Sequence, residues 1–175
     1  MKIRIGIIIS LLFIGVIGFV IWYSLPKKID QTFNGYLFGT GEKDEINEEV
    51  TITVKGEMYK KLFGQDRFKG TIDIQGDIPE NLVLNEEDVV ISFINNSGIL
   101  STFNFKRHYG QLFINSNFNK LAIIVFDEVE RTKDGASYSW DPENGLGIAA
   151  PATNRIEALD LSNEIINILK KPLEY

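Results

Sequence analysis

The stretch RFKGTIDIQ, residues 67–75, alternates apolar and polar side chains more regularly than any other part of this 175-residue chain. Phe68, Gly70, Ile72 and Ile74 occupy every second position, and charged or polar residues stand between them. Because successive side chains of a strand point to opposite faces, this period of two predicts a strand with one buried and one solvated face. The stretch therefore favours a domain built on an antiparallel sheet.

Further strands are expected on both sides of this stretch. Residues 50–54 alternate valine and isoleucine with threonine in the same way. Three more candidates cover residues 89–94, 99–106 and 110–114. The segments between them, Asn95-Asn96-Ser97-Gly98 and Arg107-His108-Tyr109-Gly110, have the composition of turns. Two consecutive hairpins are therefore expected.

Residues 121–126, with the sequence LAIIVF, are apolar without alternation. Such a run indicates a central strand that is buried on both faces. One face requires a cover other than the sheet's own core. The C-terminal segment is the expected cover.

Residues 154–171 predict an amphipathic helix. The residues on its apolar half are Ala158, Leu159, Leu161, Ile165, Ile166, Ile168 and Leu169. Asn154 and Glu157 have the spacing of a capping box, and Lys170 and Lys171 suit the negative end of the helix dipole before Pro172 ends the helix. A helix lying on a membrane surface is the alternative, although the acidic polar face suits an anionic bilayer poorly.

Near the N-terminus, residues 5–23 contain nothing more polar than Ser10. As a helix this run is about 28 Å long, close to the ~30 Å hydrocarbon core of a bilayer. Trp22 and Tyr23 sit where aromatic rings prefer the interface. An uncleaved transmembrane signal anchor is expected. A cleaved secretory signal is the alternative, but its apolar core is usually only about 7–15 residues long.

The expected organisation is a short tail at residues 1–4, a transmembrane helix at 5–24, a stalk at 25–31 and one β-rich domain at 32–175. The fold class is α+β and mainly β. An N-terminal transmembrane helix precedes an antiparallel β meander or sandwich, which is packed by one C-terminal amphipathic helix.

Charge bears on location and partners. All 24 acidic residues and 14 of the 18 basic residues lie after residue 28, so the domain carries a net charge of −10. Basic residues are too scattered to bind a polyanion, and nucleic acid is not expected as a partner. Two basic residues lie on each side of the apolar run, and the terminal amine favours an N-terminus inside the cell. The domain is expected outside the cytoplasmic membrane; a cytoplasmic domain is the alternative.

Most catalytic chemistries are excluded by residue content. The chain has no cysteine, which excludes disulfides, thiolate metal sites and a sortase-like nucleophile. Its one histidine, His108, lies beside Arg107 in an expected exposed turn, where a general base is disfavoured. Ser24-Leu25-Pro26 lacks the further motifs of a signal peptidase, and no phosphate-binding glycine loop is present. No catalytic residue, metal or cofactor is assigned.

One cluster of carboxylates and two acidic loops remain as alternative candidates for catalysis or cation binding. Asp127, Glu128 and Glu130 follow the central strand and are the carboxylates available to a cell-envelope hydrolase, with Glu128 and Glu130 sharing a face if the strand continues. The loops at residues 42–49 and 141–145 hold enough oxygens for calcium but lack the EF-hand spacing, and a solvated loop is the favoured interpretation.

The segment from Ser137 to Thr153 is expected to be a long irregular loop. Tyr138 and Trp140 at its start are the candidate ligand-binding residues, because exposed aromatic rings stack on sugars and peptides. The favoured interpretation of Trp140 is structural: it plugs the edge of the core between the last strand and the helix.

The segment from Val50 to Gly76 contains KGEMYKKLFGQDRFKGTIDIQG, in which two alternating strands flank Tyr59–Phe63 and Asp66-Arg67-Phe68. It resembles small single-pass extracytoplasmic membrane proteins of Bacillus-type Gram-positive bacteria that have no assigned function. The resemblance implies location and fold, not activity. We expect a binding or envelope-structural module, held to the lipid bilayer by its N-terminal helix, with an envelope protein or wall polymer as partner.

Overall fold

The computed structural model describes residues 2–79, 82, 84, 88–101, 108–131 and 135–166, and within the N-terminal helix it describes side chains from Leu11 onward. The helices are α1 (Lys2–Ser24), the short 3-10 helix η1 (Gly41–Lys43) and α2 (Arg155–Ile165). The strands are β1 (Lys27–Gly39), β2 (Asn47–Tyr59), β3 (Asp66–Gln75), β4 (Val89–Phe93), β5 (Ser97–Ser101), β6 (His108–Ile114), β7 (Leu121–Val125), β8 (Asp127–Arg131), β9 (Ala136–Ser139) and β10 (Leu146–Ala150).

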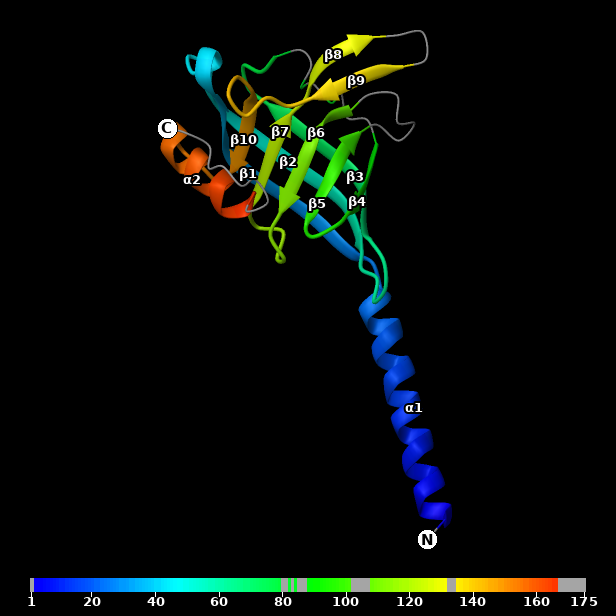
Figure 1. Cartoon of the computed structure of the whole chain (residues 1–175). Helices are drawn as coiled ribbons and strands as arrows, with labels where there is room; N and C mark the ends of the chain where they lie inside the picture. Colours follow the sequence, from blue (N-terminus) through cyan, green and yellow to red (C-terminus); the bar gives the residue numbers. More distant parts are fainter. Residues whose placement is uncertain are drawn as a thin grey trace.

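Helix α1 projects away from the rest of the molecule (Figure 1). Counting only the residues whose side chains are described, no helix is both long enough and apolar enough to cross a membrane. The helical conformation expected for residues 5–24 is confirmed. The expected membrane span is not supported by the residues whose side chains are described.

Eight strands form one antiparallel sheet in the order β4-β3-β2-β1-β10-β7-β6-β5. Consecutive strands lie side by side from β1 to β4 and from β5 to β7, and β10 fits between β7 and β1. The expected mainly β, antiparallel architecture is thus confirmed, and its strand order is that of a meander interrupted by β10. Strands β8 and β9 form a separate two-stranded ribbon, which projects at the end of the molecule far from α1 (Figure 1).

Strands β4 and β5, at the two ends of this order, are joined by a tight turn. Ile94 and Ser97 exchange backbone hydrogen bonds of 2.8 and 3.0 Å. Asn95 and Asn96 between them adopt left-handed conformations, with φ of 51° and 64°. Asparagine tolerates this region, and two such residues in a row suit a hairpin turn. The turn confirms the first expected hairpin and makes the sheet curl on itself.

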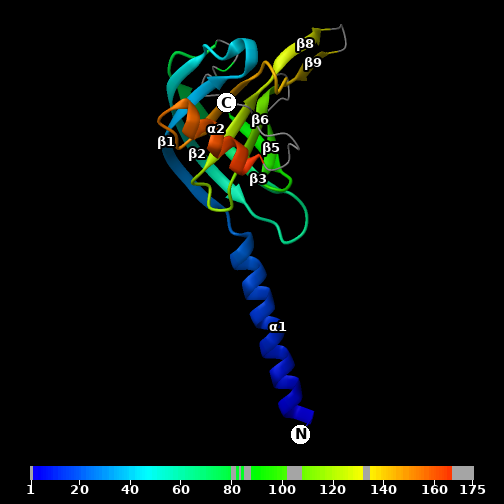
Figure 2. The same ribbon diagram turned by 60° about the vertical axis from the view of Figure 1, so that its left-hand side comes forward.

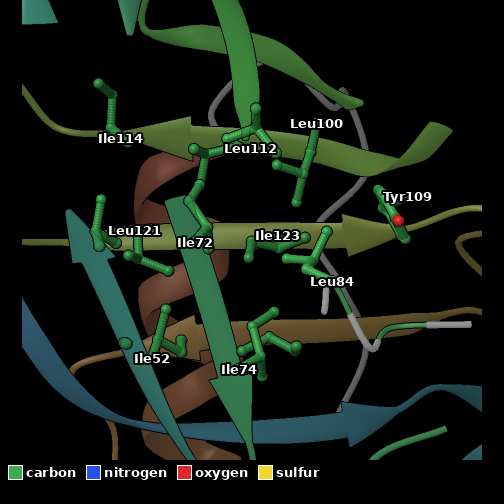
Figure 3. Close-up of a cluster of buried hydrophobic side chains, with 14 of the residues drawn as sticks. Ile52, Ile72, Ile74, Leu84, Leu100, Tyr109, Leu112, Ile114, Leu121 and Ile123 are labelled. Atoms are coloured by element: carbon green, nitrogen blue, oxygen red, sulfur yellow. The ribbon is translucent and has the colours of Figure 1, made fainter. Parts of the chain in front are cut away.

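The interior of this curled sheet is one apolar core. Figure 3 shows side chains of β2 and β3 lying across from those of β6 and β7. Ile72 and Ile74 are buried, as the alternation of residues 67–75 predicts, whereas Lys69 and Gln75 are exposed. All eight strands of the sheet contribute buried residues to the same cluster.

Strand β7 is buried on both faces, as its unbroken apolar sequence predicts. Leu121, Ile123 and Val125 point into the core of the sheet. Ala122 and Ile124 lie on the outer face, in a second cluster with Ile166 at the end of α2. Helix α2 lies against the outer face of β1, β10 and β7 (Figures 1 and 2). The expected packing of the C-terminal helix on the sheet is therefore confirmed for the described residues.

The start of α2 is capped by side chains. The Oδ1 atom of Asn154 accepts a hydrogen bond of 3.0 Å from the backbone N–H of Glu157. The Glu157 carboxylate returns to Thr153, accepting from its N–H at 2.9 Å and from its hydroxyl at 2.8 Å. The expected capping box is present but reaches one residue further back. Ile168, Leu169, Lys170, Lys171 and Pro172 lie outside the described residues.

Two expected connecting segments are strands. Strand β1 begins at Lys27, so most of the expected stalk at 25–31 is paired with β2, with Lys27 opposite Met58. The expected loop at 137–153 contains most of β9 and all of β10. The sequence does not predict β10 as a strand, because Gly147 and Ala149 on its outer face are small and apolar and the segment therefore does not alternate.

The second hairpin is displaced from its expected position. Residues 108–110 belong to β6, so the turn expected at 107–110 is wrong for these residues. Residues 102–107 lie outside the described part of the chain. His108 is half-buried at the start of β6, and its ring meets the edge of Tyr138 with centroids 5.6 Å apart and planes at 80°. The prediction that His108 is exposed in a turn is therefore wrong.

Candidate functional site

A cavity of about 270 Å³ opens at the end of the sheet from which α1 leaves. It lies where β1 is longer than its neighbour β10. On one side β1 pairs with β2 from Lys27 onward, but on the other side it pairs with β10 only from Tyr36 to Gly39. The lower half of β1 therefore stands apart from the β6–β7 connection, and the cavity occupies this gap.

The cavity has an apolar floor and a polar rim. The floor is formed by Ile29, Met58, Phe93, Ile114 and Phe118. The rim is formed by Lys27, Lys60, Asp66, Asn96, Asn115, Ser116 and Asn117. A concave site with both apolar and polar lining groups can hold a small molecule that has an apolar and a polar part.

Phe118 closes the floor from an uncommon backbone conformation. Its φ is 55°, in the left-handed region that aromatic residues rarely adopt. The surrounding turn stabilises it: the Phe118 N–H donates to the Asn115 carbonyl at 3.0 Å, and the Asn115 side chain accepts from Asn119 N–H at 3.0 Å. The Phe118 ring stacks on Phe68 with centroids 6.0 Å apart. The turn thus holds this ring between the core and the cavity.

The rim of the cavity is cationic. Lys27 is exposed and Lys60 is half-buried, and among the described residues neither lies within 4 Å of a carboxylate oxygen. Asp66, the acidic residue of the rim, accepts a backbone hydrogen bond from Lys61 at 3.0 Å. Two ammonium groups against one engaged carboxylate favour an anionic ligand.

Sequence reasoning missed this site. Its lining comes from the starts or ends of β1, β2, β3, β4 and β6 and from three connecting segments, so no local pattern connects the residues. The one local signal was the pair Lys60-Lys61 beside the exposed dipeptide Leu62-Phe63.

The expected ligand-binding residues lie elsewhere, and in different environments. Trp140 is half-buried between β10 and α2, and its Nε1 donates to the Leu146 carbonyl at 3.2 Å. It packs on the two outer clusters, which are the one with Ala122, Ile124 and Ile166 and a second one with Phe38, Ala149 and Leu159. Tyr138 lies on β9 beside His108. The placement of Trp140 fits the structural interpretation, since its one hydrogen-bond donor is already used within the fold.

The three carboxylates after the central strand are not brought together. The Nζ atom of Lys43 lies 2.8 Å from Oδ2 of Asp127. Glu128 pairs with Tyr138 and Glu130 with Ser137, with a bulge at Val129 between them. Because Ser137 and Tyr138 are adjacent and point to opposite faces, Glu128 and Glu130 are placed on opposite faces too. The expectation that these two share a face is wrong.

The acidic loops have structural partners. Asp141 accepts a hydrogen bond from the N–H of Glu143 at 2.9 Å, and the Asn144 side chain accepts from the N–H of Glu42 at 3.0 Å. The first contact lies within the loop before β10, and the second holds that loop against η1. In the described part of the chain, no group of three or more acidic or histidine side chains is placed to hold a metal ion.

Comparison with known proteins gives no relative. No protein-family model, curated protein or solved structure matches this chain.

Proposed function

We propose that this protein is a single-pass membrane protein, whose β-rich domain serves as a binding module on the extracytoplasmic side. Counted over all 23 residues, including those before Leu11 whose side chains are not described, helix α1 is about 35 Å long, comparable to the ~30 Å hydrocarbon core of a bilayer. The domain's own strands and α2 fill its core, so α1 is not needed to complete the fold.

The observation that carries the proposal is the exposure of α1. Apolar side chains all around the helix are exposed rather than packed on the sheet, among them Leu11, Phe13, Ile14, Ile17 and Trp22. A helix that is apolar on every side requires an apolar surrounding. A bilayer supplies one, and the amphipathic rings of Trp22 and Tyr23 then lie at its interface.

The cavity at the α1 end supports a binding role. Its two lysines and its asparagines suit an anionic head group, and its apolar floor suits a short hydrocarbon segment. We therefore propose that the ligand of this cavity is a small amphiphile with an anionic head group. An envelope protein or wall polymer remains the larger partner that such a module would serve.

Carbonate extraction of membranes tests the anchor. Wild-type protein is expected to stay in the membrane pellet, whereas the double variant Ile14→Arg/Ile17→Arg is expected to be released. Each arginine near the centre of a span costs about 2.5–3.5 kcal/mol of insertion free energy. The matched control is Val129→Arg/Ile156→Arg, which places two arginines at exposed apolar positions outside α1. Release of the wild type would overturn the anchor.

Protease treatment of wall-free cells tests orientation. Digestion of the domain on intact cells is expected. Protection on intact cells, with digestion in lysate, would place the domain in the cytoplasm.

Calorimetry of the full chain in detergent tests the cavity. Hexyl phosphate is expected to bind more tightly than uncharged hexanol, and Lys60→Gln is expected to remove this preference. Lys69→Gln is the control, because Lys69 is an exposed lysine of β3 that does not line the cavity. Equal binding of the two probes by the wild type would refute an anion site.

A further inference from the structure

We infer that the loop between β2 and β3 is a second membrane contact, which holds the α1 end of the domain against the bilayer surface. This inference rests on the proposed anchor. The loop comprises residues 60–65, with the sequence Lys-Lys-Leu-Phe-Gly-Gln. It is called the docking loop below.

The tip of the docking loop exposes large apolar side chains. Phe63 is 93% exposed and Leu62 is 41% exposed. Single exposed apolar residues are ordinary on protein surfaces. An almost fully exposed phenylalanine beside an exposed leucine is instead typical of a site that binds an apolar surface. Neither side chain belongs to the core or to the outer clusters.

The position of the docking loop points to the bilayer as that surface. Strand β2 ends and β3 begins at the end of the sheet where β1 starts, because both pairs are antiparallel and Lys27 lies opposite Met58. In both views the loop lies at the end of the domain from which α1 leaves (Figures 1 and 2). Ile94, in the β4–β5 turn, is 58% exposed at the same end.

Charge at this end is complementary to an anionic bilayer. Lys60 and Lys61 precede the apolar tip, and Lys27 and Lys28 follow α1. The domain as a whole is acidic, but at this end the four lysines outnumber the nearby acidic residues Asp30, Glu57 and Asp66. Lysines near an anionic membrane surface are attracted to it, and apolar residues beside them insert at the interface. We therefore commit to anionic lipid as the occupant.

The absence of cysteine from the chain permits a single label at any chosen position. Gln65→Cys places a solvent-sensitive fluorophore on the exposed end of the docking loop and leaves Phe63 in place. The full chain is reconstituted into vesicles of phosphatidylcholine, with or without phosphatidylglycerol. Val129→Cys is the matched control, because Val129 is 67% exposed on the ribbon at the opposite end of the domain.

The label at position 65 is expected to emit at shorter wavelength in vesicles that contain phosphatidylglycerol, and to be quenched by nitroxide-bearing lipids. The label at position 129 is expected to remain water-like. Adding Phe63→Ser is expected to abolish the shift at position 65, and Lys61→Gln is expected to reduce its dependence on phosphatidylglycerol.

Three outcomes would overturn the inference. If the protein resists carbonate extraction but both labels remain water-like, the anchor stands and docking fails. If emission at position 65 depends on the protein-to-lipid ratio through self-quenching, a second copy occupies the loop. If the protein is not retained by the vesicles, the anchor fails, and the inference built on it falls too.

Discussion

Thr40 and Gly145, 105 positions apart in the sequence, are joined by three hydrogen bonds. The Thr40 N–H and hydroxyl both donate to the Gly145 carbonyl, at 3.0 and 3.2 Å, and the Gly145 N–H donates to the Thr40 hydroxyl oxygen at 2.9 Å. Thr40 follows β1 and Gly145 precedes β10, so these bonds fix the point where the first and last strands of the sheet come together. Thr40 is one of the few buried polar residues.

Thr40→Val is expected to lower the free energy of unfolding by about 1–3 kcal/mol, because it leaves the buried Gly145 N–H without its acceptor. Urea unfolding of the full chain in detergent, followed by circular dichroism, measures the change. Thr40→Ser keeps the hydroxyl and is expected to retain most of the stability. A larger loss in the serine variant than in the valine variant would contradict this account.

Gly147→Ala is expected to destabilise the protein by about 1–3 kcal/mol, through overpacking. A Cβ atom at position 147 would lie 2.5 Å from Cζ of the buried Phe38 ring. The same unfolding experiment applies. Adding Phe38→Leu to Gly147→Ala removes the ring from this contact, so the alanine is expected to cost less in the leucine background than in the wild type. An equal cost in both backgrounds would exclude a clash with Phe38.

The stability of α2 is expected to depend on pH through Glu157. Hydrogen bonds from the Thr153 backbone and hydroxyl hold the pKa of the Glu157 carboxyl below its ordinary value of 4.5. A lowered pKa means that the contribution to stability is full above about pH 4.5 and is lost as the pH falls through the folded-state value. The difference in melting temperature between wild type and Glu157→Gln should therefore be largest near neutral pH and should become small at acid pH. A difference that grows in acid would refute the cap.

Trp140→Phe is expected to cost about 1 kcal/mol, because it removes the hydrogen bond to the Leu146 carbonyl. Tyr138→Phe, on β9 two residues before Trp140, is the matched change, and it is expected to change the stability by less than about 0.5 kcal/mol. Thermal unfolding of both variants separates the two roles. Equal losses would contradict the placement of Trp140 as the structural member of the pair.

The strands that could be predicted are those whose buried faces follow from the order of apolar and polar residues within the strand itself. The alternation in residues 67–75 indicates a strand with one solvent-exposed face. The unbroken apolar run at 121–126 indicates a strand that is buried on both faces. The capping residues of α2 were predictable as well, because the interaction of Asn154 with Glu157 spans a single helical turn. In each case the residues that decide the structure are neighbours in the sequence.

By itself, the sequence determined the long apolar helix α1, most strands of the meander and the helix that covers β7. The tertiary structure alone decided that β10 would lie between β7 and β1, that the sheet would curl until β4 and β5 met at a turn, and that a cavity would remain beside the lower half of β1. Side-chain periodicity records which face of a segment is buried. The pairing of strands distant in the chain depends on backbone hydrogen bonds that every residue type can make, and on contacts such as Thr40 with Gly145.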